Sequence, residues 1–594
     1  MCGIIGYIGE ERLIKDTIIK GLKYLEYRGY DSSGTSFLFN NNYEIYKAVG
    51  KIKNLEESYD FERCSTQAIG HTRWATHGEV NKINSHPHSS INKRVILVHN
   101  GVINNYLELK KELIMKGYSF VSETDSEVIA NLIEELLKSH TMLECLEKLK
   151  TLLEGSYALA IIDTKEKDKL YFIKNLTPLL IGKGKEGNII ISDVNAGSFF
   201  TQNFISLDDL DYGYITKEKI YVFHNNEKKE KNFFKVDHKI NDISLCGFPH
   251  YMIKEIYEQP AILQKISNTY IKNSEICNIN PKAINDLRSS KKVYIIGCGT
   301  SYHAGLVGKY IFEKYNHKSI EVHIASEFDM SNLVIEEDSF FILISQSGET
   351  FDVKQVLKAI KGKYKNLLLT NVKSSSLGRE CDYVIDILAG PEIAVASTKA
   401  YSAQVAILIL LSFALRNVLQ EYENNIKEVC VSIQESLIRS HHILSLVKDH
   451  LIDKEHCFFI AKSLDYLISL EASLKLKEIS YIHSEAFPSG ELKHGTIALI
   501  EENTPVIGII SQEKHNKNLR SNLEEVKSRK AKTIVISSFS LARESDDFVV
   551  NDVCEEMMVL AFIPVFQLIA YYSALLKCKD IDKPRNLAKS VTVE

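Results

Sequence analysis

The feature that most constrains the fold of this chain is a series of short, mostly apolar runs that recurs twice in its second half. Each run has the length of a buried strand, and helix-length segments separate the runs, which is typical of a parallel sheet covered on both faces. We therefore predict two similar doubly wound parallel-sheet domains in tandem. The six predicted strands are Lys292–Ile296, Phe340–Ile344, Leu367–Thr370, Cys457–Ile460, Val506–Ile510 and Thr533–Ile536.

Polar turns follow these strands, at the sheet edge where ligands of parallel sheets bind. The turn Ser345–Thr350, Ser-Gln-Ser-Gly-Glu-Thr, follows one strand and opens a helix. Backbone N–H groups at a helix start, together with hydroxyls, form a phosphate cradle. The turn lacks the lysine and the spacing of a P-loop, so a nucleoside triphosphate is not indicated. Gly299-Thr300-Ser301 at the end of the preceding strand strengthens this prediction.

The first 230 residues or so have a different pattern, in which short β-rich runs alternate with helical stretches. This predicts a mixed α/β domain over residues 2–230, and the charged passage Asn225–Lys239 looks like a linker. The predicted strands are Ile4–Ile8, Ala158–Ile162, Leu170–Ile173 and Asn188–Ser192, and the predicted helix is Ser126–Lys138.

Cys2 is the first candidate for chemistry. Methionine is readily removed before a small residue, so we expect Cys2 to become the mature N-terminus, with its thiol and α-amine on one residue. An α-amine has a pKa of about 7.7–8.0 and can act as a base at neutral pH, so one residue would supply nucleophile and base. Taken alone, Cys2 would more commonly be an ordinary small apolar residue at the start of a strand.

Five ordered motifs support the catalytic interpretation. They are Cys2–Gly6, Arg28–Gly34, Gly70–Gly78, His99–Asn105 and Glu123–Glu127. Together they resemble the glutaminase domain of the N-terminal-nucleophile amidotransferases, a sandwich fold. The resemblance implies that Cys2 attacks the glutamine amide and that Asn100 and the backbone N–H of Gly101 form the oxyanion hole.

The same resemblance implies the glutamine pocket. Arg73 would bind the α-carboxylate through its planar guanidinium, and Asp125 would bind the α-ammonium. Thr76, His77 and Arg28 would complete or order the pocket. Trp74, the one tryptophan, would gate an ammonia passage, although core packing is the common role of this residue type.

The second half resembles the sugar isomerase (SIS) domain, twice in tandem. With a glutaminase domain before it, this arrangement is similar to the glutamine-dependent sugar-phosphate aminotransferases of the shorter, bacterial type. Further matching segments are Val395–Ala400, Lys475–Ser480, Gly490–Gly495 and Pro584–Glu594. The expected division is 2–230 for the amidotransferase domain, 231–284 for a linker and helical lead-in, 285–425 and 450–583 for the SIS domains, and 584–594 for a catalytic tail.

The resemblance implies hydrolysis of L-glutamine and transfer of the ammonia to D-fructose 6-phosphate, with isomerisation to glucosamine 6-phosphate. His494 would open the sugar ring, Lys589 would form a Schiff base at C2, and Glu478 would move a proton from C1 to C2. Lys475, one helical turn before Glu478, would tune its pKa. The residues expected to hold the phosphate and sugar are Ser345, Gln346, Ser347, Thr350, Thr300, Ser301, Val395, Ser397 and Ala588.

Other interpretations of these residues stay open at this point. Lys475, Lys477 and Glu478 could be an exposed face of an amphipathic helix, and His494 could be a satisfied surface histidine. Lys589 could be a solvated charge near the C-terminus. A SIS protein could instead act as a fructosamine-phosphate deglycase, a sugar-phosphate isomerase or a non-catalytic sugar-phosphate sensor. The intact glutaminase motifs argue against the first two functions, and no basic helix-turn-helix supports the sensor.

The amino-acid composition limits the classes of partner that this chain could bind. The formal charge of -5, without a basic face, gives no reason to expect nucleic acid. Eleven cysteines scattered singly favour a reducing compartment, the cytoplasm, and neither CxxC nor HxxxH suggests a metal. We expect no cofactor and, by resemblance, a homodimer with His494 reaching the neighbouring subunit. Met557–Leu576 is long enough to span a membrane, but it follows an α/β pattern, so we predict a buried helix and no membrane partner.

Overall fold

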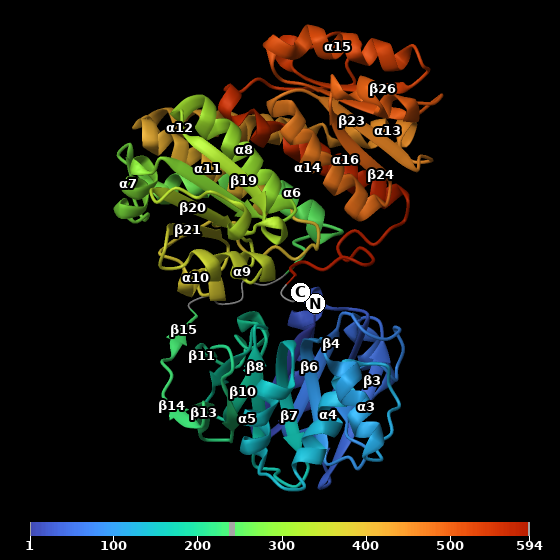
Figure 1. Ribbon diagram of the computed structural model, residues 1–594. Helices are drawn as coiled ribbons and strands as arrows, with labels where there is room; N and C mark the ends of the chain where they lie inside the picture. The colour runs from blue at the N-terminus through green and yellow to red at the C-terminus, as the bar shows by residue number, and fades with distance from the viewer. Residues whose placement is uncertain (1, 237–243, 592–594) are drawn as a thin grey trace. The chain divides into compact units, whose positions relative to one another are not determined.

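The computed structural model describes residues 2–236 and 244–591. The described chain forms two units, Met1–Ile243 with Ser590–Glu594, and Ser244–Lys589 (Figure 1). Each unit has its own core.

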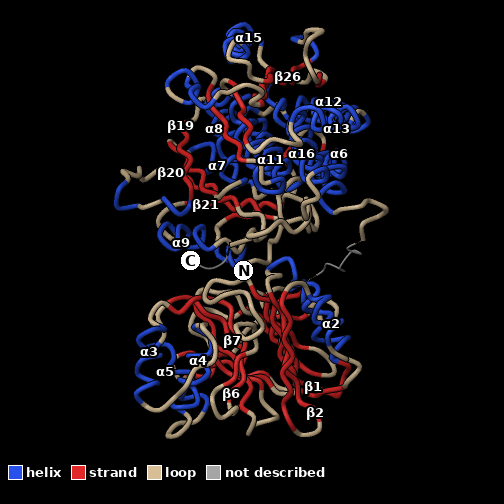
Figure 2. The backbone as a smooth tube through the Cα atoms, turned by 90° about the vertical axis from the view of Figure 1, so that its right-hand side faces the viewer, coloured by secondary structure: helices blue, strands red, loops and turns tan. Residues whose placement is uncertain are grey.

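Two antiparallel sheets face each other in the first unit and enclose a shared apolar core (Figure 2). Alternation along the strands creates this core, since Ile4, Ile8 and Ile69 of one sheet meet Ile96 and Val98 of the other. The first sheet has the order β15 (Phe234–Lys235), β11 (Asn203–Ser206), β9 (Leu180–Lys183), β10 (Gly187–Ile191), β1 (Gly3–Leu13), β4 (Cys64–Arg73), β2 (Ser32–Phe39), β3 (Asn42–Val49). The second has the order β14 (Glu227–Lys229), β13 (Ile220–His224), β12 (Tyr212–Ile215), β8 (Leu170–Asn175), β7 (Gly155–Asp163), β6 (Val95–Ile103), β5 (His88–Ser89).

Helices cover the outer faces of both sheets (Figure 2). The sandwich predicted for this half is therefore confirmed, and so are its four predicted strands. The predicted helix Ser126–Lys138 overlaps α4, which begins one residue earlier and ends two residues earlier. The helices are α1 (Lys20–Leu25), α2 (Ile52–Ser58), α3 (Tyr106–Met115), α4 (Asp125–Leu136) and α5 (Met142–Leu152).

The linker predicted at Asn225–Lys239 is wrong over its described part. Asn225 and Asn226 both have positive φ and form a tight turn, after which β14 pairs with β13. The residues of β14 are exposed and charged, a property that protects edge strands from further pairing and that hides the strand from a search for apolar runs. The last part of the predicted linker, 237–239, lies outside the described residues.

Two parallel five-stranded sheets form the framework of the second unit, as predicted. The first has the order β19 (Ser319–Ile324), β18 (Lys292–Gly297), β20 (Ser339–Ile344), β21 (Lys365–Thr370), β22 (Tyr383–Asp386). The second has the order β24 (His483–Pro488), β23 (His456–Ala461), β25 (Pro505–Ile510), β26 (Lys532–Ser538), β27 (Phe548–Val550). The six predicted strands are the three central ones of each sheet, whereas the less apolar edge strands escaped prediction.

One continuous core joins the two sheets through the helices between them. α16, which covers the predicted apolar stretch, is almost wholly buried in this core, and so is α11 (Figure 1). Both are long and apolar enough to cross a membrane, but 89% of the apolar window in α11 and 83% of that in α16 are buried in the protein. The helices are α6 (Tyr251–Tyr270), α7 (Pro281–Ser289), α8 (Thr300–Asn316), α9 (Phe351–Ile360), α10 (Ser376–Glu380), α11 (Lys399–Arg416), α12 (Leu419–Ile438), α13 (Ser440–His450), α14 (Leu464–Ser480), α15 (Glu513–Lys527) and α16 (Met558–Leu576).

Candidate functional site

Cys2 lies at the entrance to β1, directly beside the end of β4. The register that pairs Gly3 with Thr72 brings the thiol next to Trp74, whose backbone N–H donates to Cys2 Sγ at 3.2 Å. Burial raises the pKa of the Cys2 thiol, while the Trp74 N–H and the Arg73 guanidinium act in the opposite direction. A thiol held in its neutral form needs a base close by before it can act as a nucleophile.

Asn100 and Gly101, near the end of β6, lie next to this thiol. The side-chain amide of Asn100 donates from Nδ2 to the backbone carbonyl of Cys2 at 3.0 Å. Gly101 has a φ of 138°, and a Cβ at this position would collide with the Ser156 carbonyl oxygen. Only glycine fits here, so the backbone can present its N–H beside the Asn100 amide without interference from a side chain.

Behind Asn100 lie four buried histidines to which the sequence analysis gave no role: His71, His86, His88 and His99. Burial lowers the pKa of His71 to about 3, so this ring is neutral. Its Nε2 lies 3.1 Å from Asn100 Oδ1 and 2.9 Å from the His99 carbonyl oxygen. A proton on Nε2 satisfies both acceptors and fixes the Asn100 amide with its NH₂ group toward Cys2. His71 is the second residue of the Gly70–Gly78 motif, so the sequence already contained the residue that positions Asn100.

Arg73 and Asp125 approach the thiol from two elements. Arg73 ends β4, and its Nη2 donates to the carbonyl oxygens of His77 at 2.5 Å and Gly78 at 3.1 Å, which orders the loop after it. Asp125 is the first residue of α4, and its Oδ2 accepts from the Ile103 N–H at 3.0 Å. Both charged groups are almost fully buried. Thr76, the exposed neighbour of His77, completes this loop.

The side chains of Arg28 and Trp74 contact other groups than the Cys2 thiol. Arg28 is buried below the loop after β10, where its Nη1 donates to the Ser192 carbonyl oxygen at 2.6 Å. The ring of Trp74 packs edge-on against Tyr30, with 5.7 Å between the ring centroids. These contacts of Arg28 hold the loop after β10 in place, which is a structural role.

In the second unit, the turn Ser345–Thr350 forms a ring of small polar groups at the carboxyl end of β20. Ser345 Oγ lies 2.7 Å from Thr350 Oγ1 and accepts from the Gly348 N–H at 3.0 Å, and Ser347 Oγ accepts from the Glu349 N–H at 3.2 Å. Gly348 has a φ of 65°, and a Cβ there would collide with Ser375. The backbone carbonyl oxygen of Gln346 accepts a hydrogen bond from the Asn371 N–H, which fixes the position of this residue. The turn leads directly into α9.

Thr300 at the start of α8 connects this edge to α14. Lys475 Nζ donates to Thr300 Oγ1 at 3.0 Å and lies 2.5 Å from Glu478 Oε2. Thr300 also donates to Glu471 Oε1 at 3.1 Å, and the neighbouring Ser301 Oγ accepts from Gln404. The alternative of an exposed amphipathic face is therefore wrong, since Lys475 is completely buried.

Buried charges shift the pKa values of these α14 residues. Burial raises the pKa of Glu478, the Glu471 carboxylate raises it further, and Lys475 opposes both effects. The pKa of Lys475 is raised because Glu478 and Glu471 outweigh the effect of burial. A carboxylate with a raised pKa next to a buried ammonium is suited to exchanging protons with a substrate. Glu471 was not singled out from the sequence.

Lys589 is also buried, contrary to the alternative of a solvated terminal charge. Its side chain is 4% exposed; it forms an ion pair with Glu392, and its Nζ donates to the Ala394 carbonyl oxygen at 2.8 Å. Ser397 Oγ donates to the same Glu392 carboxylate at 3.1 Å. The Val395 N–H donates to the Asp582 carbonyl oxygen at 2.9 Å, which ties this loop to the chain leading into the tail. Ala588 is half-buried beside Lys589.

Glu392 and Glu255 are site residues that the sequence analysis missed. Glu392 accepts from the backbone N–H groups of Thr398 and Ala400 as well as from Lys589, and these partners hold its pKa low against burial. Glu255 on α6 lies close by, and burial together with the Glu392 charge raises its pKa to about 8. Lys589 thus faces one ionised carboxylate at neutral pH, with a protonated one behind it.

His494 lies apart from these groups. It ends a 3₁₀ helix, Glu491–His494, and its side chain is exposed. Among the described residues of the unit this side chain has no hydrogen bond or ion pair. The structure therefore brings together Thr300, Lys475, Glu478 and the Ser345 turn on one sheet edge, with Lys589 buried against Glu392, but it does not bring His494 of the same chain to them.

Comparisons with known proteins find a matching domain family for each half of the chain. The glutamine amidotransferase domain model matches residues 71–196, and the SIS domain model matches twice, over 286–414 and 450–576. The glutamine–fructose-6-phosphate aminotransferases (isomerizing) of Bacillus cereus and Listeria monocytogenes are each 44% identical to this chain over 609 and 604 aligned positions, with both chains fully covered.

A solved structure extends this likeness to the second unit. The C-terminal domain of glucosamine-fructose-6-phosphate aminotransferase from Francisella tularensis is 34% identical, with a TM-score of 0.55. It covers 57% of this chain, and this chain covers all of it. The parallel sheets thus have a solved counterpart in an aminotransferase.

Proposed function

This chain belongs to the glutamine–fructose-6-phosphate aminotransferases (isomerizing), and from that premise we propose how its residues divide the reaction. The chain is an enzyme that hydrolyses L-glutamine and transfers the ammonia to D-fructose 6-phosphate, giving D-glucosamine 6-phosphate and L-glutamate. This activity leads into hexosamine synthesis. The assignment of each step to a residue is our proposal, and it follows from the contacts above.

In the glutaminase half, we propose that removal of Met1 frees the α-amine of Cys2 as the base for its own thiol. The thiolate attacks the side-chain amide of glutamine, ammonia leaves, and water releases glutamate from the thioester. The Asn100 amide and the Gly101 N–H receive the oxyanion, with His71 positioning Asn100. Arg73 and Asp125 bind the α-carboxylate and α-ammonium, and Thr76 and His77 close the pocket.

In the sugar half, the Ser345–Thr350 turn and the first turn of α9 bind the phosphate. Thr300, Ser301, Ser397 and the backbone of Val395 and Ala588 contact the sugar. Lys589 gives a proton to Glu392 and adds to C2 of the open ketose, and water leaves to form an imine. Ammonia then displaces Lys589 from C2, and Glu478 moves a proton from C1 to C2 to give the aldose.

The observation that carries this proposal is the burial of Lys589 between Glu392 and the Ala394 carbonyl, in the unit that also contains Lys475–Glu478. An amine kept out of solvent beside a proton acceptor is suited to imine formation. A deglycase of the same fold would instead release an amine from a fructosamine phosphate.

We expect glutamine and fructose 6-phosphate to give glucosamine 6-phosphate, and a fructosamine phosphate to be consumed far more slowly. The reason is that the buried Cys2 pocket supplies ammonia, which only the amination consumes. Mass spectrometry of the products from the two substrates, each with and without glutamine, checks this. Faster turnover of the fructosamine phosphate, independent of glutamine, would favour the deglycase.

We also propose that the enzyme is a homodimer and that it works in the cytoplasm. The exposure of His494 supports the first proposal, since this side chain has no hydrogen bond or ion pair among the described residues and is open to contact with a second chain. The second is supported by the eleven cysteines, all of which are free thiols.

Mixing two inactive variants tests the dimer. His494→Ala and Lys589→Arg chains, refolded or exchanged together, are expected to recover about a quarter of native activity, because half of the dimers are mixed and each has one complete site. Synthase assays of the mixture and of each variant alone measure this. No recovery in a mixture that sedimentation shows to contain mixed dimers would place His494 in its own chain's site, or outside it.

A further inference from the structure

The two parallel sheets of the second unit repeat each other at the turns where the first sheet builds its sugar site. The turn before α8 has Gly299 with φ 52° and ψ −124°, and the turn before α14 has Ser463 with φ 59° and ψ −125°. Ser345-Gln346 follows β20, and Ser511-Gln512 follows the corresponding strand β25. The second sheet therefore presents the same kind of edge as the first, at a place to which no step of the reaction is assigned.

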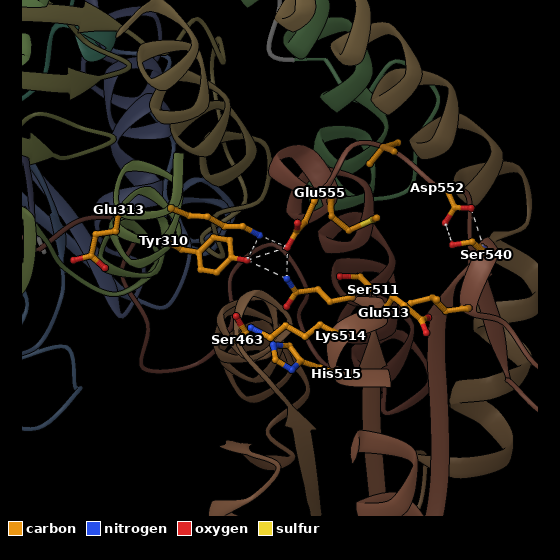
Figure 3. A pocket seen from close by; sticks show the side chains of 15 residues that line it. Tyr310, Glu313, Ser463, Ser511, Glu513, Lys514, His515, Ser540, Asp552 and Glu555 are labelled. Carbon is orange, nitrogen blue, oxygen red and sulfur yellow. Dashed lines mark hydrogen bonds and ion pairs between the residues drawn. The ribbon is translucent and has the colours of Figure 1, made fainter. Parts of the chain in front are cut away.

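A cavity of about 960 Å³ lies at this second edge (Figure 3). Residues of α8 line it opposite the strand ends of the second sheet, just as α14 residues line the first site. Its labelled side chains come from both halves of the unit (Figure 3). Its volume is that of a site for a small molecule. The residues that line it include Tyr310, Lys314, Ser463, Gln512, Lys514 and Glu555.

Two of the four acidic residues that line the cavity, Glu555 and Glu313, form ion pairs with lysines of the protein. Glu555 accepts from Lys314 at 2.6 Å, from Gln512 at 2.5 Å and from Tyr310 at 3.0 Å. Asp552 accepts from the backbone N–H and the hydroxyl of Ser540. The paired carboxylates of Glu555 and Glu313 therefore repel an anionic ligand less than free ones would, whereas Glu513, the first residue of α15, is exposed to solvent.

The donors of the cavity are, in contrast, available. Lys514 Nζ and Ser463 Oγ have no hydrogen bond or ion pair among the described residues. The first turn of α15, a helix of 15 residues, has no side-chain cap; the His515 N–H donates to the Gln512 carbonyl oxygen at 3.0 Å, which leaves the N–H groups of Glu513 and Lys514 at the helix end. The same combination of helix start and hydroxyl forms the phosphate cradle of the first site.

Gln512 supplies an independent sign of a ligand. Its side chain is 7% exposed, and its Nε2 is fixed between Glu555 and the Tyr310 hydroxyl, which determines which end of the amide is the oxygen. The Oε1 atom has no partner among the described residues. A buried acceptor without a donor costs stability, and a hydroxyl group of a ligand would satisfy it after a small movement of the side chain.

We propose that this cavity binds a second phosphorylated sugar, with the phosphate at the start of α15 beside Lys514 and Ser463 and a sugar hydroxyl on Gln512. Lys314 stands on α8 at the position that Glu478 holds on α14, counted from Gly299 and Ser463. The carboxylate that would move a proton is thus replaced by an ammonium held by Glu555. The second site binds its ligand and does not isomerise it.

Counting bound ligand tests the proposal. The probe is D-glucitol 6-phosphate, which has the phosphate and hydroxyls but no carbonyl for Lys589. Equilibrium dialysis is expected to give two molecules per native chain. Lys514→Glu places a negative charge at the start of α15, so we expect at least tenfold weaker binding of one molecule, with the other molecule and the synthase activity unchanged. Lys527→Glu, the same charge change at the far end of α15, is the control and should keep both.

A Ser345→Ala/Thr350→Ala double variant separates the two sites, since it should lose only the molecule bound at the first. Binding of only one probe molecule per native chain would overturn the proposal. So would binding of two probe molecules with equal affinity by the Lys514→Glu variant. Inorganic phosphate that competes at the second site as well as the probe does would likewise overturn the assignment to a sugar. Failure of the proposed reaction would instead appear as lost synthase activity with both molecules still bound.

Discussion

Replacing Cys2 with alanine is expected to lower glutamine-dependent synthesis of glucosamine 6-phosphate by a factor on the order of 10⁴ or more, the loss typical of removing a catalytic nucleophile. Ammonia-dependent synthesis should remain, because Lys589, Glu478 and the phosphate turn lie in the other unit. Trp74 offers the thiol only backbone groups, its N–H and its carbonyl oxygen. Assays with glutamine and with ammonium salts as alternative nitrogen donors measure the two rates.

Cys64→Ala is the matched control. Cys64 is a half-buried free thiol in the same unit, at the start of β4, and far along that strand from Trp74. Its removal should leave both activities near the native level. Persistence of glutamine-dependent synthesis in the Cys2 variant would show that another group cleaves glutamine.

The second large effect is expected at Lys589. Arginine keeps the positive charge facing Glu392, but it stays protonated and cannot form the imine, so Lys589→Arg should reduce synthesis by a factor on the order of 10⁴. Hydrolysis of glutamine should continue. Borohydride reduction in the presence of fructose 6-phosphate should attach the sugar to the native chain and not to this variant, and mass spectrometry of the intact chain detects the adduct.

Glu478→Gln separates imine formation from proton transfer. This variant should still be trapped by borohydride, because Lys589 and Glu392 are intact, whereas its synthesis should fall by about 10²–10⁴, the contribution of a general base. Lys579→Arg, an exposed change near the tail, is a control for arginine substitution. Sugar attached to Lys589→Arg would show that the imine forms elsewhere.

The central strands could be predicted from the sequence because they are buried on both faces. Phe340–Ile344 and Val506–Ile510 are continuous apolar runs, each with a polar turn after it, and that combination is typical of the middle of a parallel sheet. Edge strands lack it. β14 consists of Glu227, Lys228 and Lys229, and it forms because two asparagines make a tight turn before it.

The site could be predicted where several residues of one motif act together, as in Gly70–Gly78. It could not be predicted where a single acidic residue acts from a distant segment. Glu392, Glu471 and Glu255 are ordinary carboxylates in the sequence, and they gain a role only when folding places them beside Lys589 or Lys475. Glu392 is 197 positions from its partner Lys589. Glu471 is 171 positions from Thr300, and its nearer partner Lys475 lies one turn further along the buried face of α14.

The measurement that most directly tests the coupling of the two halves is the fate of the glutamine amide nitrogen. Native enzyme is given fructose 6-phosphate and glutamine labelled with ¹⁵N at the side-chain amide, and the sugar product is analysed by mass spectrometry. The account predicts one ¹⁵N at C2 of glucosamine 6-phosphate for each glutamate formed. Glutamate released without labelled amino sugar, from a chain whose mature N-terminus is Cys2, would contradict it.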